Sequence, residues 1–500
     1  MEGQELFMSK TIIIGGGLGG LSAAVTLANA GMEVELYEKN DHFGGKLMPV
    51  QLGTHSFDFG PNTITMPEVF KAVIEQTGEA AADYFDLIPL TTHTRNHFAD
   101  GRHLDFSSDQ EIMQAELNRV AADDAKNYRR FLNEISRIYD LSERYFFPST
   151  FQSWRDYLSP SLGKALLQVR PAETMDHFYK KYFKDPVLLQ AFGRYATYIG
   201  SSPYKAPATF SMIAYLELVG GVYYAKGGNT RIAEGFAAVA KKRGARLYSG
   251  KPVKRIIVKD GKAAGVELDD GTVSEADAVI LNGDLLTAFP QLTAENERPS
   301  FSNEKSESFE PSISAFVILA GLNTRLPELK HHNVYFSEDY PKEFDELFEK
   351  KSYSEEPTVY ISNSSATDPS VSPEGDNLFI LVNAPALTPD GKLQIDAETY
   401  KNRIYDFLEN YGLNIRSHLA EEKVFTPSFI AENFNAFRGA LYGPSSHRKK
   451  DAFLRPANAS PDIKNLFFVG GSTHPGGGSP MVTMSGHNVA TRILKKFGLL

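Results

Sequence analysis

Residues 11–20 read Thr-Ile-Ile-Ile-Gly-Gly-Gly-Leu-Gly-Gly, and this stretch decides the fold. Four β-branched residues predict a strand, the glycines predict a tight turn, and the Ala- and Leu-rich segment after them predicts a helix. Gly15 allows the sharp turn, Gly17 lets the backbone approach a pyrophosphate, and Gly20 lets the helix pack closely against the strand. The sequence therefore predicts a dinucleotide site that includes Gly15, Gly17, Leu18, Gly19 and Gly20.

A second strand is expected at residues 34–37, and it leads directly to Glu38, eighteen residues beyond Gly20. An acidic side chain at this place accepts hydrogen bonds from a ribose hydroxyl and repels the extra phosphate of NADP. We therefore predict that Glu38 and the adjoining Lys39 belong to the cofactor site. The alternative is a glycine-rich turn followed by a glutamate on the surface.

The same region is also compatible in length with a membrane span. Residues 11–32 are uncharged over 22 positions, about the length needed to cross a bilayer. Six of these residues are glycines, and each weakens a helix by about 1 kcal/mol relative to alanine. The pattern favours strand, turn and helix.

Composition excludes several classes of protein. The 500 residues include no cysteine, which rules out disulfides, Cys-ligated metals and thiol nucleophiles, so redox chemistry requires a bound cofactor. A net charge of −10 argues against nucleic acid as a partner. The twelve histidines show no metal-binding spacing, and we predict no metal site. The first residues lack the basic start of a secretory signal, so a cytoplasmic location is expected.

The last fifty residues predict a second glycine-rich loop. An apolar strand at 465–469 leads into a loop at 470–480 and then a helix whose first turn contains Pro480. A helix that starts at such a loop presents its positive end to an anion or to a reduced flavin ring. Gly470, Gly471, Pro480, Met481 and Val482 are therefore candidate cofactor-binding residues.

The middle of the chain divides into three parts. Residues 66–222 are predicted to be helical and aromatic, and the stripe that begins at Tyr128 fits helix core better than a substrate tunnel. Within this part, 148–171 interleaves aromatic and basic residues, as in a membrane-interface segment or in a packed surface helix. Residues 253–282 predict a β-meander with turns at Asp260-Gly261 and Asp270-Gly271. Residues from about 300 to 455 mix strands and helices.

Several motifs taken together resemble a known family. They are Ile14 to Gly20, Glu38, Gly44-Gly45-Lys46, Asp58 to Pro61, Tyr198 to Ser202, Gly227-Gly228 and Thr473 to Gly476. The chain resembles the bacterial carotenoid desaturases and oxidases of the phytoene desaturase family, most closely the C30 group of 4,4'-diaponeurosporene oxygenases and diapophytoene desaturases. The resemblance implies FAD as the cofactor. We expect Gly45, Lys46, Gly60, Pro61, Asn62 and Val253 to complete its site.

The resemblance also implies the fold class. We expect an α/β protein with a Rossmann-like FAD-binding domain, made of a parallel sheet and a β-meander, next to an α+β substrate-binding domain and a helical membrane-proximal region. The FAD domain is predicted to comprise residues 8–65, 223–300 and 456–500. The substrate domain is predicted to comprise 66–222 and 301–455, with 148–171 as a candidate membrane-contact segment.

Two activities occur among the proteins that the chain resembles. Both remove hydride from an allylic C–H of a polyene; loss of a proton then gives desaturation, whereas capture by water or oxygen gives terminal oxidation. Residues 14–20, 200–208, 331–333 and 476–483 resemble the oxidases, while Thr473-His474-Pro475-Gly476 resembles the desaturases. We predict oxidation of the terminal methyl of a C30 carotenoid, with desaturation as the alternative. An amine-oxidase-like flavoenzyme and a non-enzymatic isoprenoid-binding protein are further alternatives.

Two residues are candidates for catalysis. His474 could orient a group or relay a proton beside the flavin, or be a loop histidine with a structural hydrogen bond. Arg438 could stabilise reduced flavin or a polar end group, or form a surface salt bridge. The expected partners are an apolar C30 carotenoid and the inner face of the cell membrane, to which the protein would bind peripherally. The sequence does not indicate an oligomeric state.

Overall fold

The structure is a computed structural model that describes residues 9–151, 160–391, 396–447, 452–453 and 455–500. Its first sheet is parallel and five-stranded, with the order β19-β13-β1-β2-β9. These strands are β19 (Leu466–Phe468), β13 (Ala278–Leu281), β1 (Lys10–Ile14), β2 (Glu33–Tyr37) and β9 (Arg246–Tyr248). They come from three separate parts of the chain, and the parallel sheet expected from the sequence is confirmed.

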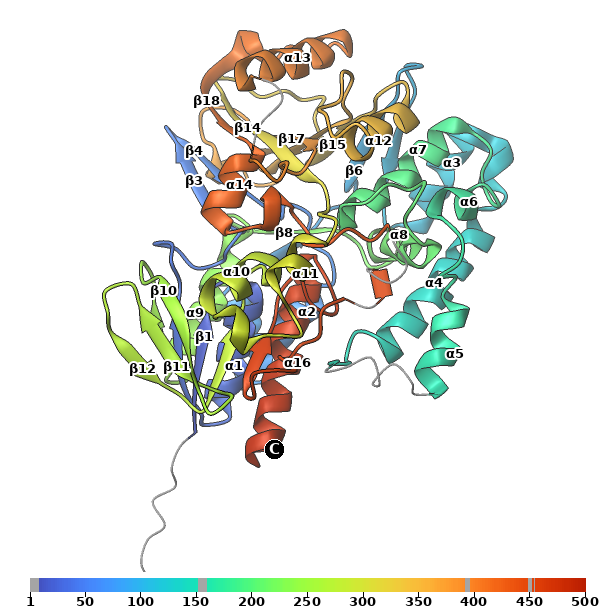
Figure 1. Cartoon of the computed structure of the whole chain (residues 1–500). Helices are drawn as coiled ribbons and strands as arrows, with labels where there is room; N and C mark the ends of the chain where they lie inside the picture. The colour runs from blue at the N-terminus through green and yellow to red at the C-terminus, as the bar shows by residue number, and fades with distance from the viewer. Residues whose placement is uncertain (1–8, 152–159, 392–395, 448–451, 454) are drawn as a thin grey trace, which may run out of the picture.

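Helices cover this sheet, and two of them lie side by side. They are α1 (Leu18–Asn29) and α16 (Ser479–Phe497), with α2 (Pro67–Glu75) and α9 (Thr230–Lys242) packed against them (Figure 1). A Cβ added at Gly486 of α16 would lie 2.0 Å from the Gly19 carbonyl oxygen of α1, so the two backbones are in direct contact. The first and last parts of the chain therefore form one structural unit.

The predicted β-meander is also present. It is an antiparallel sheet of β10 (Val253–Lys259), β11 (Lys262–Leu268) and β12 (Val273–Glu275). The helices α10 (Leu285–Leu292) and α11 (Asn303–Glu307) follow it.

A seven-stranded mixed sheet forms the upper half of the molecule in Figure 1. Its order is β18 (Leu419–Phe425), β14 (Ser314–Leu322), β17 (Asn377–Ala384), β16 (Val359–Asn363), β15 (His332–Tyr335), β6 (Thr94–His97) and β7 (His103–Phe106). The helix α12 (Tyr340–Phe348) connects β15 to β16, α13 (Ala397–Asn410) connects β17 to β18, and α14 (Pro427–Phe434) follows β18. Two short pairs complete the β structure: β3 (Pro49–Leu52) with β4 (His55–Asp58), and β5 (Leu87–Pro89) with β8 (Tyr223–Ala225).

The strands β5, β6 and β7 correct the prediction that residues 66–222 are helical. β6 reads Thr-Arg-Asn-His and has no apolar residue, so its sequence gives no strand signal. It forms because it pairs in parallel with β15, more than 200 residues away. Tertiary pairing, which local propensity does not reveal, fixes this edge of the sheet.

The rest of that region is helical, as predicted. It contains α3 (Gln110–Ala125), α4 (Tyr128–Tyr145), α5 (Pro160–Gln168), α6 (Met175–Tyr179), α7 (Pro186–Gly193), the 3₁₀ helix η3 (Arg194–Ile199) and α8 (Met212–Leu218). Tyr128, Phe131, Ile135 and Ile138 are buried in one core cluster with α7. The aromatic stripe is therefore helix core, the interpretation that the sequence favoured.

The candidate membrane-contact segment is only partly described, since residues 152–159 lie outside the described ranges. In α5, the side chain of Leu167 is 79% exposed. Among the described helices, none combines the length and the apolar character needed to span a bilayer.

Candidate active site

A cavity of about 720 Å³ extends from the glycine-rich loops to the seven-stranded sheet. Every residue predicted to bind the cofactor lines it except Gly20. A Cβ added at Gly20 would lie 2.2 Å from the Gly15 carbonyl oxygen, so Gly20 permits the close approach of α1 to the turn. The structure thus brings together loops from the first 65 and the last 45 residues of the chain.

The first loop carries the features of a phosphate cradle. Gly15 has φ of +99°, and an added Cβ would lie 2.3 Å from the carbonyl oxygen of Asn282. The helix α1 begins after Gly17, whose side chain cannot cap it, so the first backbone N–H groups remain available at the cavity. These groups and the helix dipole favour an anion here.

Glu38 is held rigidly at the same end. One carboxylate oxygen accepts the N–H of Gly16 at 2.7 Å and the other accepts the N–H of Asn40 at 2.9 Å. Glu38 is 6% exposed and lines the cavity. A carboxylate oxygen has two lone pairs, so each retains one for a hydroxyl group of a ligand.

Sequence reasoning missed Asn282 as a site residue. It follows β13, the neighbour of β1, and its side-chain amide donates to the Gly15 carbonyl oxygen at 2.9 Å. Asn282 also lines the cavity. Its position in the sequence could have indicated this role. Like Glu38, Asn282 directly follows the carboxyl end of a strand in the parallel sheet, where such folds bind ligands.

The second loop brings another helix start to the cavity. The helix α16 begins at Ser479 with Pro480 in its first turn, and Gly478 before it has φ of +109° and offers no side-chain cap. Gly470, Gly471, Met481 and Val482 line the cavity beside it. The positive ends of α1 and α16 therefore both face this space.

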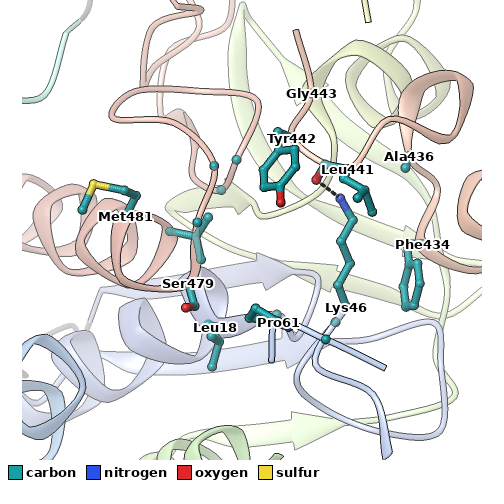
Figure 2. Close-up of a pocket in the computed structure, with 18 of the residues that line it drawn as sticks. Leu18, Lys46, Pro61, Phe434, Ala436, Leu441, Tyr442, Gly443, Ser479 and Met481 are labelled. Atoms are coloured by element: carbon teal, nitrogen blue, oxygen red, sulfur yellow. Dashed lines mark hydrogen bonds between the residues drawn. The ribbon is translucent and has the colours of Figure 1, made fainter. Parts of the chain in front are cut away.

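Lys46 lines the cavity to the right of Leu18 and Ser479 in Figure 2. Its Nζ donates to the carbonyl oxygen of Leu441 at 2.5 Å, and the rings of Tyr442 and Phe434 lie on either side of it in this view. Burial lowers the pKa of Lys46, and the charge of Asp284 opposes this shift. Burial raises the pKa of Asp284, whose carboxylate accepts the N–H groups of Leu286 and Phe437.

Arg455 is a second residue that the sequence did not reveal. It is 8% exposed, lines the cavity, and donates from Nη1 to the carbonyl oxygen of Gly471 at 2.9 Å. It therefore fixes the second glycine-rich loop from outside that loop.

Asp58, the first residue of the motif Asp58 to Pro61, contributes to the site by holding neighbouring segments in place. The Asp58 carboxylate accepts the N–H groups of Asn229 at 2.7 Å and Thr230 at 3.1 Å, at the start of α9. The Asn229 amide in turn donates to the carbonyl oxygens of Pro61 and Asn62. Asp58 thus positions Gly60, Pro61 and Asn62 at the cavity without lining it.

The far part of the cavity is an apolar chamber. Alternate residues of three strands face it: Ile313, Ala315 and Val317 before and in β14, Phe379 and Leu381 in β17, and Thr358 and Tyr360 before and in β16. Because successive side chains of a strand point to opposite faces, this spacing of two means that one face of the sheet forms the floor. Phe147, Phe210, Met212, Ile213 and Leu216 close the other side.

One wall of this chamber is polar. It is formed by Arg194, Tyr198, Tyr340 and Asn383 together with Thr358, which also belongs to the floor, and we call these five residues the polar wall. Behind it, Glu343 accepts hydrogen bonds from Thr358 at 2.6 Å and Ser337 at 3.0 Å, and burial raises the pKa of Glu343 to about 7.

His474 does not line the cavity. Its Nε2 lies 2.8 Å from the carbonyl oxygen of Phe146, and its ring contacts Phe151 edge to face at 4.4 Å. Since a carbonyl only accepts, Nε2 carries the proton. Burial lowers the pKa of His474 to about 4. The geometry therefore favours the alternative that His474 is a neutral, hydrogen-bonded loop histidine.

Arg438 also lies outside the cavity lining. Its guanidinium donates to the carboxylate of Glu307 at 2.6 Å, and Glu307 is exposed. The geometry thus favours the surface salt bridge over a catalytic role. Among the described residues, no group of three or more His, Asp or Glu side chains is arranged to hold a metal ion.

A family model matches most of the chain. The model described as Flavin containing amine oxidoreductase matches residues 18–494. The chain belongs to this family. The match begins at Leu18, just after the first turn glycines, and covers the second glycine-rich loop and the whole of the seven-stranded sheet.

Relatives within the flavin family are carotenoid enzymes. The 4,4'-diapolycopene oxygenase of Methylomonas sp is 35% identical over 491 residues, which are 97% of this chain and 98% of the relative. The 1-hydroxycarotenoid 3,4-desaturase of Flavobacterium sp. (strain P99-3) is 35% identical over 482 residues, 96% of this chain and 97% of the relative. These matches confirm the predicted family, that of the carotenoid desaturases and oxygenases, and the chain is an oxidoreductase of the flavin family.

Solved structures agree on the fold. The crystal structure of an oxidoreductase from Methanosarcina mazei superposes with a TM-score of 0.62 over 96% of this chain and 100% of that chain. Its sequence identity is 17%, so this similarity concerns the fold alone. The predicted fold class is confirmed.

Proposed function

We propose that this protein binds FAD and oxidises the terminal methyl group of an apolar C30 carotenoid of the 4,4'-diaponeurosporene or diapolycopene type. The observation that carries the proposal is that a single cavity joins two dinucleotide-type loops to an apolar chamber. The relatives named as carotenoid oxygenases support the substrate class.

The residues at the loops fit FAD. The N–H groups at the start of α1 suit the pyrophosphate, and the remaining lone pairs of Glu38 suit ribose hydroxyls. Lys46, Pro61, Gly471 and the start of α16 would surround the flavin ring. When bound, FAD supplies an acceptor for the hydride of an allylic C–H bond.

The chain's own residues bind and orient the substrate. The floor of alternate strand residues and the aromatic side chains above it bury an apolar polyene and exclude water. Among the described residues that line the apolar chamber, none carries a carboxylate or an imidazole. The chamber therefore controls which carbon lies at the cofactor, and a general base is not part of it.

Desaturation is the second candidate. The identity to the 1-hydroxycarotenoid 3,4-desaturase is the same as that to the 4,4'-diapolycopene oxygenase, 35% in both cases. Expression of the protein in cells that make either diapophytoene or diaponeurosporene separates the two. Oxygen on the terminal methyl of diaponeurosporene supports oxidation. New double bonds on diapophytoene, with diaponeurosporene unchanged, would establish the desaturase instead.

Binding to a membrane belongs to the same proposal. A substrate that is insoluble in water requires delivery from a lipid phase, and we therefore propose peripheral binding to the cytoplasmic face of the cell membrane. Cosedimentation of the purified protein with vesicles tests this. A protein that stays in the supernatant at all lipid concentrations would contradict it.

A further inference from the structure

Arg194 is a charged residue in the wall of a largely apolar chamber. Its side chain is 6% exposed, and it lines the cavity. Among the described residues, no carboxylate lies within 4.0 Å of its guanidinium, and its Nε has no hydrogen-bond partner. Burying a charge without a full set of hydrogen bonds is unfavourable, so such a group calls for a compensating partner.

The nearest negative charge is directed elsewhere. The Glu217 carboxylate accepts hydrogen bonds from Tyr195 at 3.0 Å and from Tyr198 at 2.5 Å, and it does not line the cavity. Within the described part of the chain, Arg194 is linked to Glu217 through the Tyr198 hydroxyl, to which Nη2 donates at 3.3 Å. Glu217 therefore offsets the charge of Arg194 but leaves N–H donors of the guanidinium unused.

A second unused donor lies on the same wall. Tyr340 is 2% exposed and lines the cavity, and its hydroxyl has no partner among the described residues. A Cβ added at Gly193, the residue before Arg194, would lie 3.6 Å from the Tyr340 ring, so the two residues belong to neighbouring parts of the wall. An oxygen atom could accept from both, whereas a hydrocarbon could accept from neither.

The element η3 links the polar wall to the part of the cavity at Tyr442. Gly200 follows η3 and packs against Tyr442, since an added Cβ would lie 2.8 Å from that ring. The six residues of η3 extend about 12 Å of backbone, and the Arg194 guanidinium reaches back along them to the Tyr198 hydroxyl.

We propose that Arg194 and Tyr340 form a subsite for a terminal oxygen, carbonyl or carboxylate, at one end of the polyene. This rests on the proposed function, because it takes the ligand to be a carotenoid. The subsite selects chains that already carry oxygen at one end and fixes how far they slide past the cofactor.

Direct binding tests the subsite without turnover. The flavin-loaded protein is titrated with cis-parinaric acid, a fluorescent conjugated tetraene with a carboxylate end, and with the matched hydrocarbon tetraene. We expect the wild type to bind the acid more tightly. Arg194→Met should weaken the binding of the acid 10- to 100-fold and the binding of the hydrocarbon less than 3-fold, because only the acid loses a charge-assisted hydrogen bond. Equal weakening of both would overturn the proposal.

Two variants guard against a general loss of structure. Arg298 is 1% exposed, donates to Phe301 and Asn303, and does not line the cavity. Arg298→Met removes a buried arginine outside the cavity and should leave the preference for the acid over the hydrocarbon intact. Loss of that preference in Arg298→Met would count against the subsite. Arg194→Lys keeps the charge and should restore part of the preference.

Kinetics separate this proposal from the proposed function. The ratio of kcat/KM for the terminal aldehyde of diaponeurosporene to that for diaponeurosporene should fall at least 10-fold in Arg194→Met. A wild type that turns over neither carotenoid but prefers the acid in binding would contradict the function and keep the subsite. A wild type that turns over both without preference for oxygen would contradict the subsite alone.

Discussion

Lys46 donates a hydrogen bond from Nζ to the carbonyl oxygen of Leu441 across 395 residues of sequence, at 2.5 Å. The bond ties the loop that follows β2 to the segment that follows α14, and both residues line the cavity (Figure 2). Its position makes Lys46 the residue whose replacement should most affect both the cavity and the reaction.

Lys46→Met should destabilise the protein by about 1–3 kcal/mol, because the carbonyl of Leu441 loses its donor inside the cavity. We also expect kcat to fall at least 10-fold while flavin stays bound, since the positive charge next to the reacting centre is lost. Thermal unfolding, flavin absorbance and turnover are the measurements.

The pH profile gives an independent check on Lys46. Burial lowers its pKa, so the ammonium loses its proton at a lower pH than an ordinary lysine does, and activity should fall as pH rises through that value. Lys46→Arg keeps the charge at all these pH values and should lack this alkaline limb. If the arginine variant shows the same loss of activity at high pH, that loss is due to the titration of another group.

Glu38→Ala should weaken FAD retention about 10- to 100-fold. The variant loses the acceptor for ribose hydroxyls and also frees the N–H groups of Gly16 and Asn40. Dissociation of flavin on dilution, followed by fluorescence, measures this. Glu38→Gln keeps one acceptor oxygen, and its FAD retention should lie between those of the wild type and the alanine variant. An alanine variant that retains FAD as well as the wild type does would contradict the role of Glu38 in binding the ribose.

His474→Gln should leave kcat within about 2-fold, because the imidazole contacts Phe146 and Phe151 and does not line the cavity. A glutamine amide also donates to the Phe146 carbonyl oxygen. A loss of turnover of 10-fold or more with flavin bound would restore the proton-relay hypothesis.

The same variant should change the dependence of stability on pH. The folded-state pKa of His474 is lowered to about 4, so between pH 6.5 and 4 the unfolded chain binds the proton and the folded protein does not. Stability should therefore fall as pH falls through this window, by at most about 3 kcal/mol from this residue. The glutamine variant should show a shallower fall in chemical denaturation, with the remainder due to other buried histidines such as His93 and His331.

Arg438→Met should alter neither kcat nor flavin binding by more than about 2-fold. The guanidinium pairs with exposed Glu307, and such surface pairs contribute about 1 kcal/mol or less. Turnover and thermal unfolding measure both effects. A selective loss of kcat would show that Arg438 acts on the cavity from a distance.

The sequence by itself determined the features that depend on neighbours along the chain. The strand, turn and helix at residues 10–29, the position of Glu38 after the second strand, and the start of α16 at a glycine-rich loop each require only local geometry. Local patterns of this kind also carry the family resemblance, which is why the fold class and the cofactor end of the cavity were predictable.

Only the tertiary structure decided what lies opposite these loops. Asn282 on Gly15, Leu441 on Lys46 and β6 on β15 are contacts between segments that are far apart, and no local pattern specifies them. The direction of a side chain is likewise set by its packing. The His474 ring contacts Phe146 and does not line the cavity, whereas Arg194, which no sequence motif marks, lines the chamber. Side-chain direction and long-range pairing follow from the packed core, because the core alone fixes which buried polar groups find partners.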